Sequence, residues 1–366
     1  MKLPKTIAFV ITSRCNLRCK MCFQYGETAK KMKIKGNALL KHYHELNFSE
    51  IKRIINKINK YYPQNNRPEF FITGGEPFIR QDMIKIIEYL SENDNKVVVN
   101  TNFSLVNRNM ITQLVRIVNF LPLVSIDGTE QIHDQIRGVN GTYAKAIRNL
   151  KFFSSKNKLS LICTTITKYN IDHLIEIYKS FKDLNIILFL KHVAWMPKKY
   201  IDVQKEMSKK YFGVEFKVFF PESVSVTKEK IKLLEEKIKT ISKLKNKIDV
   251  NYAESARPDG RTVYEHHCTF SLKQENKICT SPELTILPNG DISFCNGGAY
   301  GLGPIISNIL RDELPTILKK KQPLEKIYNQ LLKKGILFPV CVKCSYLNNK
   351  HNFLEKIKNF NLNIFK

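Results

Sequence analysis

The sequence lacks any apolar run that approaches the roughly 18 residues needed to cross a bilayer. A secretion signal is also missing, because the apolar stretch in residues 1–12 is too short and runs directly into a cysteine-containing loop. The nine cysteines are an odd number and are clustered, which argues against a disulfide framework in a chain without such a signal. We therefore expect a cytoplasmic protein whose cysteines are catalytic or bind metal.

Acidic residues are scarce, since 33 Asp and Glu stand against 60 Lys and Arg and give a formal net charge of +27. Such a charge favours acidic partners, among them nucleic acid, an acidic peptide or an acidic redox protein, although it also fits a general bias toward lysine. Basic and aromatic residues are not concentrated in the kind of stripe that follows nucleic acid. We therefore do not expect nucleic-acid binding.

What the sequence does contain is a triplet of closely spaced cysteines. Cys15, Cys19 and Cys22 follow a short apolar stretch with the spacing C-x3-C-x2-C. Three thiolates leave one iron of a 4Fe–4S cluster open to a substrate or cofactor. Taken alone, the triplet also fits a zinc site. In either case the loop is a candidate active site.

Residues 1–200 alternate short apolar runs with amphipathic stretches. The runs are typical of strands buried on both faces, and they cover Ile7–Thr12, Phe70–Thr73, Val97–Asn100, Leu123–Ile126, Leu159–Ile166 and Ile186–Val193. Helical patterns lie between them. We expect Ser49 to cap the first of these helices, and the others are expected at Asp82–Ser91, Met110–Phe120, Thr142–Phe153 and Ile171–Phe181. This order predicts an α/β fold with parallel strands, either an open doubly wound sheet or an incomplete (β/α) barrel. In both, chemistry gathers at the carboxyl ends of the strands.

The second half of the chain has a different character. A lysine-rich helix is expected at Thr227–Lys247, and two apolar stretches on either side of Pro288-Asn289-Gly290 predict a β-hairpin. The hairpin would bring Cys279 and Cys295 toward one centre, to which Cys341 and Cys344 could add two thiolates. Four thiolates fit either a zinc ion or an iron–sulfur cubane.

Two further motifs give the cysteine triplet a context. GGEP at Gly74–Pro77 follows the second predicted strand, and SIDG at Ser125–Gly128 follows the fourth. With the triplet, they resemble the radical S-adenosylmethionine (SAM) superfamily. The resemblance implies a partial (β/α)6 TIM-like barrel and a 4Fe–4S cluster whose open iron binds SAM. It also implies reductive cleavage of SAM to a 5′-deoxyadenosyl radical, which abstracts hydrogen from a substrate.

The resemblance also implies which residues contact SAM. They are Phe23, Gly74, Gly75, Glu76, Pro77, Thr101, Asn102, Ser125, Asp127 and Arg137. Arg137 suits the SAM carboxylate because its planar fork can donate twice, although a surface ion pair is the alternative. We expect a structural role for His133, and strand alternation predicts that only one of Lys191 and His192 points inward.

Beside such a core, the four late cysteines resemble the twitch domain, the short form of the SPASM domain. The resemblance implies one auxiliary 4Fe–4S cluster on Cys279, Cys295, Cys341 and Cys344, with zinc as the alternative. We therefore expect a core at 1–200, a helical insertion at 201–267, a small α+β auxiliary domain at 268–350 and a tail at 351–366. Cys268 is a candidate hydrogen donor or a non-catalytic thiol, and Cys163 is expected in the core.

These features predict a radical SAM oxidoreductase. A peptide or protein substrate is favoured by the pattern from Ser125 to Tyr143; the alternatives are a sugar, an aminoglycoside or a nucleotide, or a non-enzymatic zinc protein that binds nucleic acid. Sulfatase-maturing relatives have an aspartate where this chain has Asn296, so that role is disfavoured. A leader-peptide-binding domain before the core is not expected either. A flavodoxin- or ferredoxin-type protein is the expected electron donor.

Overall fold

The computed structural model describes residues 3–22, 44–193, 197, 199–215, 224–243, 248–249, 283–294, 304–336 and 338 of the chain. Within these ranges, no helix is both long and apolar enough to cross a bilayer. The predicted tail at 351–366 lies outside them.

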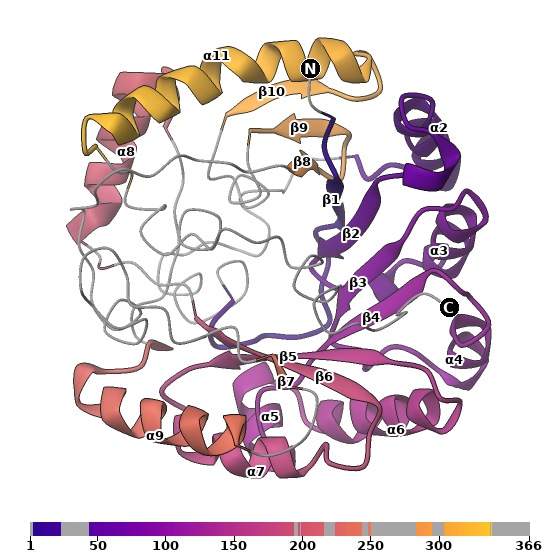
Figure 1. Ribbon diagram of the computed structural model, residues 1–366, viewed down its shortest axis with the longest axis vertical. Coiled ribbons are helices and arrows are strands. Elements are labelled where there is room, and N and C mark those ends of the chain that lie inside the picture. The colour runs from indigo at the N-terminus through magenta and orange to yellow at the C-terminus, as the bar shows by residue number, and fades with distance from the viewer. Residues whose placement is uncertain are drawn as a thin grey trace.

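Six parallel strands form the centre of the fold, as the apolar runs predict. They are β1 (Thr6–Thr12), β2 (Glu69–Gly74), β3 (Val97–Thr101), β4 (Phe120–Ser125), β5 (Ser160–Ile166) and β6 (Ile186–His192). Each pairs in parallel with the next in sequence. The sheet is curved, and helices lie along its convex side (Figure 1). This arrangement confirms the α/β fold with a partial barrel.

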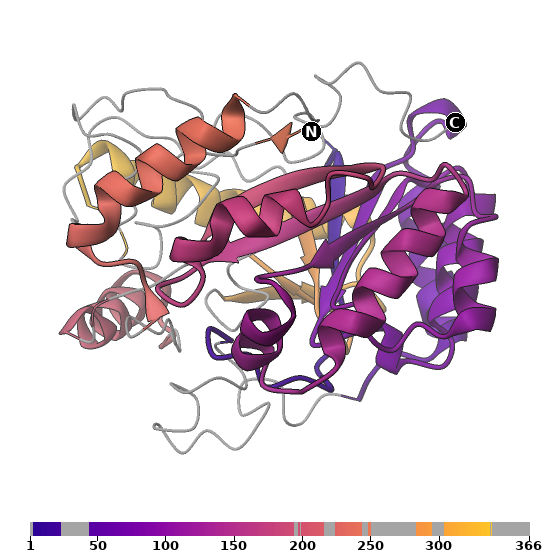
Figure 2. The ribbon, with the colours of Figure 1, turned by 90° about the horizontal axis from the view of Figure 1, so that it is seen from below.

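The helices that follow these strands cover one face of the sheet. They are α2 (Phe48–Asn59), α3 (Met83–Glu92), α4 (Arg108–Leu114), α5 (Glu130–Arg137), α6 (Thr142–Ser155) and α7 (Leu174–Lys179), with short 3-10 turns at Gln64–Asn66, Pro77–Ile79 and Ile171–His173. Seen from below, the purple and magenta helices stack on one side of the strands, whereas the yellow α11 (Leu314–Lys333) lies at the opposite end (Figure 2).

Two of the helix predictions were wrong in detail. The cap of α2 is Asn47, not Ser49, because the Asn47 side chain accepts from the Glu50 N–H while Glu50 accepts from the Asn47 N–H. This reciprocal capping box satisfies two donors at the start of the helix. Helix α4 ends at Leu114 rather than at Phe120, because Phe120 already belongs to β4.

The predicted hairpin is present, and it extends the central sheet. Strands β8 (Glu283–Ile286) and β9 (Asp291–Ser293) are antiparallel, and β9 pairs with β10 (Ile305–Asn308). On its other side β8 pairs in parallel with β1, so the strand order is β10-β9-β8-β1-β2-β3-β4-β5-β6-β7. The segment before the hairpin contributes α8 (Lys199–Phe212), α9 (Ile231–Ser242) and β7 (Ile248–Asp249), which pairs with β6. The predicted helix at Thr227–Lys247 is therefore shorter than expected.

The two faces of the sheet differ in composition. Alternate side chains of the strands pack with the helices in the main core, for example Ile72, Val99 and Ile162. The other face carries a smaller apolar cluster, formed by Val98, Leu121, Leu123, Leu161, Ile187 and Phe189. Toward the carboxyl ends, the same alternation brings polar residues to this inner face, among them Thr73, Asn100 and Ser125. The polar end of the inner face therefore lies where catalysis is expected.

Candidate functional site

The cysteine loop starts where β1 ends. Cys15, Cys19 and Cys22 are thiols that form no disulfide among the described residues, each of intermediate exposure, and the Leu17 N–H donates to the Cys15 sulfur at 3.4 Å. Burial raises the pKa of Cys15 to about 12 and also raises the pKa of Cys19. In the absence of metal these two cysteines are therefore neutral thiols, and their use as ligands requires that the metal displace the protons.

The GGEP loop packs directly on the cysteine loop. The Gly75 N–H donates to the Thr12 carbonyl at 2.9 Å, and the Glu76 N–H donates to the Arg14 carbonyl at 2.8 Å. A Cβ atom on Gly75 would lie 2.1 Å from the Arg14 carbonyl oxygen, and Gly74 has a φ of +154°. The two glycines thus let the GGEP backbone approach the backbone of the cysteine loop. The motif itself predicts a close approach to a ligand instead.

Glu76 is buried at the centre of this contact, with 1% of its surface exposed. Its Oε1 accepts from the Thr101 hydroxyl at 2.6 Å and from the Phe78 N–H at 3.1 Å, while Oε2 accepts from the Asn102 N–H at 2.7 Å. Burial raises the pKa of Glu76 to about 7, although these three donors oppose the shift. Three predicted SAM contacts, Glu76, Thr101 and Asn102, therefore lie in one hydrogen-bonded group.

Asn102 connects this group to the cysteine loop a second time. The Asn102 side chain donates to Asn16 Oδ1 at 2.9 Å, and the Asn16 amide donates to the Ser104 hydroxyl at 3.1 Å. Ser104 in turn donates to Asn102 Oδ1 at 2.6 Å. Asn16 lies between Cys15 and Cys19 and was not predicted from the sequence, because its partners are more than 80 residues away in the chain.

Asp127 and Arg137 form a buried ion pair on the other side of the cysteine loop. Arg137 Nη2 lies 2.6 Å from Asp127 Oδ2, with side-chain exposures of 11% and 0%. Arg137 Nη1 donates to the Cys19 sulfur at 3.6 Å. Burial raises the pKa of Asp127, but the Arg137 guanidinium opposes that shift, and Asp127 and Cys19 together raise the pKa of Arg137. The ion pair is not on the surface, contrary to the alternative considered for Arg137.

His133 has a fully buried ring on helix α5. Its Nδ1 accepts from the Asp127 N–H at 3.2 Å, and its ring meets the Tyr143 ring edge-on with centroids 5.7 Å apart. Burial lowers the pKa of His133 to about 3, so the ring is neutral at physiological pH. These contacts are those of the structural role that we expected.

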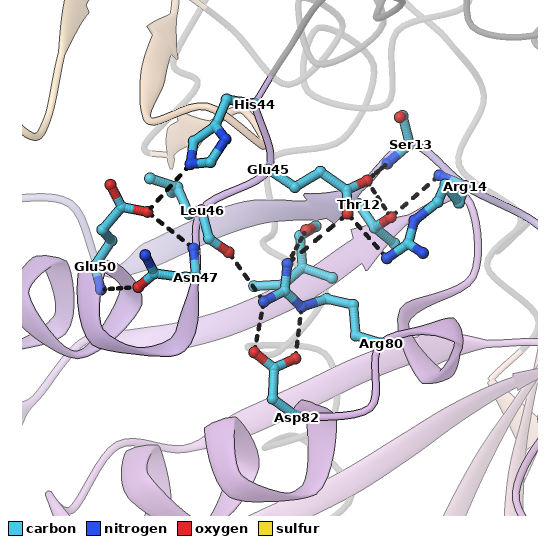
Figure 3. Close-up of polar contacts among 11 residues, drawn as sticks. Thr12, Ser13, Arg14, His44, Glu45, Leu46, Asn47, Glu50, Arg80 and Asp82 are labelled. Atoms are coloured by element: carbon cyan, nitrogen blue, oxygen red, sulfur yellow. Dashed lines mark hydrogen bonds and ion pairs between the residues drawn. The ribbon is translucent and has the colours of Figure 1, made fainter.

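A second polar network, which the sequence did not predict, holds the start of the cysteine loop (Figure 3). Glu45 accepts from the Thr12 hydroxyl at 2.5 Å and from the Ser13 N–H at 3.2 Å, and it pairs with Arg14 at 3.1 Å. Arg80, which follows the GGEP loop, donates to Asp82 through two nitrogens and to the carbonyls of Ile11 and Leu46. Charged residues near a motif are common in sequences, and only the fold identifies these as its supports.

The inner face of the sheet brings Ser125 beside Cys163, and Lys191 is close enough to act on the Cys163 thiol. Ser125 on β4 pairs with Cys163 on β5, and Lys191 on β6 pairs with Thr165. Cys163 lies in a strand as expected but is only half-buried, against the inner apolar cluster. Lys191 lies on this inner face, in alternation with Ile187 and Phe189, and lowers the pKa of Cys163 against the larger effect of burial, which raises it.

Several predicted site residues cannot be placed. Phe23, Cys268 and the four late cysteines, Cys279, Cys295, Cys341 and Cys344, lie outside the described residues, as does Asn296. Of the last group, Cys279 and Cys295 lie in sequence on either side of the hairpin formed by β8 and β9. Their proposed role as ligands stays a prediction.

With the geometry established, comparison with known families identifies the region. Residues 9–181 match the family model of the radical SAM superfamily. The chain carries a radical SAM domain. This domain includes the cysteine triplet, the GGEP loop and the Asp127–Arg137 pair.

Curated relatives resemble the same part of the chain. An AdoMet-dependent heme synthase from Oleidesulfovibrio alaskensis is 27% identical over 195 residues, which cover 50% of this chain and 46% of the relative. A cysteine-type anaerobic sulfatase-maturating enzyme from Clostridium novyi is 30% identical over 193 residues, covering 49% and 48%. The chain thus spans about half the length of these relatives.

Solved structures resemble nearly the whole chain in fold. The structure of anSMEcpe with bound AdoMet matches with a TM-score of 0.63 and 15% identity, covering 97% of this chain and 95% of that one. Streptococcus suis SuiB bound to its precursor peptide SuiA matches with a TM-score of 0.57 and 15% identity, covering 92% and 67%. At this identity the likeness shows the fold alone.

Radical SAM proteins use a 4Fe–4S cluster and SAM, and the cysteine loop fits such a cluster. Among the residues that the structure describes, no group of three His, Cys, Asp or Glu side chains converges to hold a single metal ion. A cubane differs from a single ion, because its three thiolate ligands bind three different irons. The three cysteines are flanked in sequence by Arg14, Arg18 and Lys20, whose positive charges offset the negative charges of thiolate ligands.

Proposed function

We propose that this chain is a radical SAM oxidoreductase that modifies a peptide or protein. The observation that carries the proposal is that the loop with the three cysteines is hydrogen-bonded to both the GGEP loop and the end of α5, within a radical SAM domain. When bound, a 4Fe–4S cluster on Cys15, Cys19 and Cys22 supplies the electron that cleaves SAM to a 5′-deoxyadenosyl radical, and this radical takes hydrogen from the substrate.

The protein's own residues would hold SAM from two sides. On one side, the loop Gly74–Pro77 with Thr101 and Asn102 would bind the methionine end, and a SAM ammonium near Glu76 would favour the ionised carboxylate, whose pKa burial raises. On the other side, Ser125 and Arg137 would bind the carboxylate, and Asp127 would hold the Arg137 guanidinium in place. Phe23 would complete the site. The charge of Arg137 also lowers the pKa of Glu76, which supports a common site for both sides.

The names of similar proteins support a peptide or protein substrate. The Clostridium novyi relative matures a sulfatase, and the SuiB structure contains the precursor peptide SuiA. Asn296 cannot act as a base at neutral pH, so we propose a peptide or protein modification other than sulfatase maturation. A tetrapyrrole substrate is the second candidate, because the Oleidesulfovibrio alaskensis relative is named as a heme synthase. The relatives described above lend no support to a sugar, an aminoglycoside, a nucleotide or a nucleic acid.

The first experiment tests the radical chemistry. Protein reconstituted anaerobically with iron and sulfide is given SAM and dithionite, and 5′-deoxyadenosine is measured by mass spectrometry. We expect product from the wild type and none from a variant in which Cys15, Cys19 and Cys22 are all replaced by Ala. A matched control replaces Cys163, which lies outside the triplet, and should retain the signal. Absence of product from cluster-replete wild type would contradict the proposal.

The second experiment identifies the substrate class. The deoxyadenosine acquires the hydrogen that was abstracted, so deuterium from a labelled peptide or from a labelled tetrapyrrole appears in it. Cell extracts with and without active enzyme supply the candidate peptides. Deuterium transfer from the tetrapyrrole and not from any peptide would reverse the order of the two candidates.

We further propose that residues 268–350 hold one auxiliary cluster. The hairpin that lies in sequence between Cys279 and Cys295 supports this, because Thr285 on β8 pairs with Ser293 on β9. Two cubanes contain about eight irons and about eight sulfides. The variant Cys341→Ala with Cys344→Ala should lose about half of each, whereas a zinc site would leave the iron content unchanged and release zinc instead.

Two smaller proposals concern Cys268 and the electron donor. Cys268 could donate a hydrogen atom to a substrate radical; in that case Cys268→Ser keeps deoxyadenosine formation but stops formation of the final product.

A flavodoxin- or ferredoxin-type donor fits the net charge of +27, and its reduction of the enzyme should slow as the salt concentration rises. A rate that does not change with salt would contradict electrostatic docking.

A further inference from the structure

Helix α5 ends against the cysteine loop and holds Cys19 from both sides. The Arg18 N–H donates to the Arg137 carbonyl at 3.0 Å, and the Lys20 N–H donates to the Ile136 carbonyl at 2.8 Å. The residues before and after Cys19 are therefore both fixed to the last turn of this helix. The position of the Cys19 sulfur depends on α5 as well as on its own loop.

The side chain of Arg137 reaches the sulfur from the same helix turn. One outer nitrogen donates to Cys19 Sγ at 3.6 Å, and the other lies 2.6 Å from Asp127 Oδ2. Arg137 Nε is buried and has no hydrogen-bond partner among the described residues. Two of the three nitrogens are thus engaged within the protein, and Nε is the one left for a ligand such as the SAM carboxylate.

Asp127 is held so that Arg137 cannot turn away from Cys19. Asp127 Oδ1 accepts from the Thr165 N–H of β5 at 2.8 Å, and its own N–H donates to His133 Nδ1 at 3.2 Å. Its carbonyl accepts from the Asn170 side chain at 2.8 Å. Three hydrogen bonds therefore fix Asp127, two through its backbone and one through its carboxylate, and the remaining carboxylate oxygen pairs with the Arg137 guanidinium.

This geometry has a consequence for electron transfer. A single electron from an external low-potential donor adds one negative charge to a cluster bound here, and no bond in the protein forms or breaks. Hydrogen bonds to ligand sulfurs, nearby charge and burial set the reduction potential of iron–sulfur clusters. A buried cation beside a ligand sulfur stabilises the added charge, whereas a buried anion opposes it, and little water is present to screen either.

We propose that the Asp127–Arg137 pair sets the reduction potential of the cluster on Cys15, Cys19 and Cys22, with the Arg137 charge acting on the Cys19 sulfur and the buried Asp127 charge opposing it. This inference rests on the proposed function. It goes beyond the contact with SAM, because it assigns Arg137 an effect on the cluster that does not require SAM to be bound.

The test is an anaerobic redox titration followed by electron paramagnetic resonance. Addition of SAM changes the signal of the cluster with the open iron, which distinguishes it from an auxiliary cluster. At a fixed potential near the wild-type midpoint, Arg137→Gln should lower the ratio of reduced to oxidised cluster about tenfold, which is about 59 mV for one electron. Asp127→Asn should raise that ratio, because an opposing negative charge is removed.

Two further variants separate charge from structure. Arg137→Lys keeps the positive charge and should shift the ratio less than Arg137→Gln. Arg80→Lys weakens another pair, between a buried arginine and a partly exposed aspartate, with 2.7 Å between Arg80 Nη2 and Asp82 Oδ2, and should leave the ratio unchanged. If Arg137→Gln assembles no cluster, the opposite shifts expected for Asp127→Asn and Arg137→Lys still decide the question.

The outcomes are distinct. Shifts of opposite sign for the arginine and aspartate variants support the inference. Unchanged ratios, or shifts of the same sign, would show that the pair only shapes the loop and would overturn it. A wild type without any SAM-responsive signal would instead overturn the proposed function, so the two failures can be told apart.

Discussion

At the scale of single residues, the site is built from charged groups that the fold has taken out of water. Glu76 is the clearest case, since a carboxylate with 1% exposure accepts three hydrogen bonds and still has a pKa raised to about 7. Without a cationic ligand, its charge is therefore a cost to the folded state. This cost makes Glu76 suited to bind the ammonium group that the GGEP motif predicts.

The pH dependence of stability should reveal Glu76. Its folded pKa of about 7 lies above the ordinary value of 4.5, so the folded state holds a proton that the unfolded chain releases. Raising the pH through this window removes stability. From pH 5 to pH 8, the free energy of unfolding of metal-free wild type should fall by about 2 to 3 kcal/mol more than that of Glu76→Gln, as measured by urea unfolding. Parallel pH profiles of the two proteins would contradict this.

Arg80 and Arg14 allow a comparison between a buried and an exposed cation that reach the same carboxylate. Both approach Glu45, but the Arg80 side chain is 6% exposed and the Arg14 side chain 55% exposed. Arg80→Leu leaves Asp82 and two carbonyls without their donor, and should lower the free energy of unfolding by about 3 to 5 kcal/mol. Arg14→Leu should lower it by about 1 kcal/mol or less. Equal losses in urea unfolding would show that Arg80 does not clamp the loop.

At the scale of elements, the site depends on how tightly loops and helix ends approach one another. Gly138 caps α5 with a φ of +74°, and a Cβ atom there would lie 2.7 Å from the Arg18 carbonyl oxygen in the cysteine loop. Gly141 has the same φ of +74° at the start of α6, but nothing lies within 4 Å of its Cβ position. A comparison of the two glycines therefore distinguishes the effect of the backbone conformation, which they share, from the effect of contact with the cysteine loop, which only Gly138 makes.

The variants Gly138→Ala and Gly141→Ala should both lose stability through backbone strain, and Gly138→Ala should lose more through a steric clash. Each forces alanine into the left-handed region, which costs about 1 to 2 kcal/mol. Gly138→Ala must also displace the backbone beside Cys19, which adds about 1 to 3 kcal/mol. Thermal unfolding and the iron content after reconstitution measure both effects. Only Gly138→Ala should lose iron, and equal iron in both variants would contradict a link between α5 and the cluster loop.

The elements themselves were largely predictable, whereas their contacts were not. The apolar runs gave all six central strands, because strands buried on both faces leave a local pattern of Val, Ile, Leu and Phe. The motifs likewise indicated the site, since they follow the strands directly. Contacts such as Arg137 to Cys19 or Asn16 to Asn102 join residues 118 and 86 positions apart. No local pattern encodes such pairs, and Glu45 and Arg80 were missed for the same reason.

At the scale of the whole molecule, the position of the hairpin is the main result that the sequence did not predict. The turn at Asn289-Gly290 predicted the hairpin itself, but nothing local indicated that β8 would pair with the free edge of β1. The pairing covers that edge and makes one continuous sheet from β10 to β7. Side chains of β8 therefore belong to the main core, among them Leu284 and Ile286.

This continuity predicts that the late hairpin and the early strands unfold together. Ile286 on β8 and Ile72 on β2 are both fully buried in the main core. Replacing either by Ala should cost about 2 to 5 kcal/mol, since each leaves a cavity in the same packed interior. In urea unfolding followed by circular dichroism and by fluorescence, both variants should shift the same transition by similar amounts. If Ile286→Ala moved a separate, earlier transition and left that of the strands in place, β8 would belong to a unit that folds independently of the barrel.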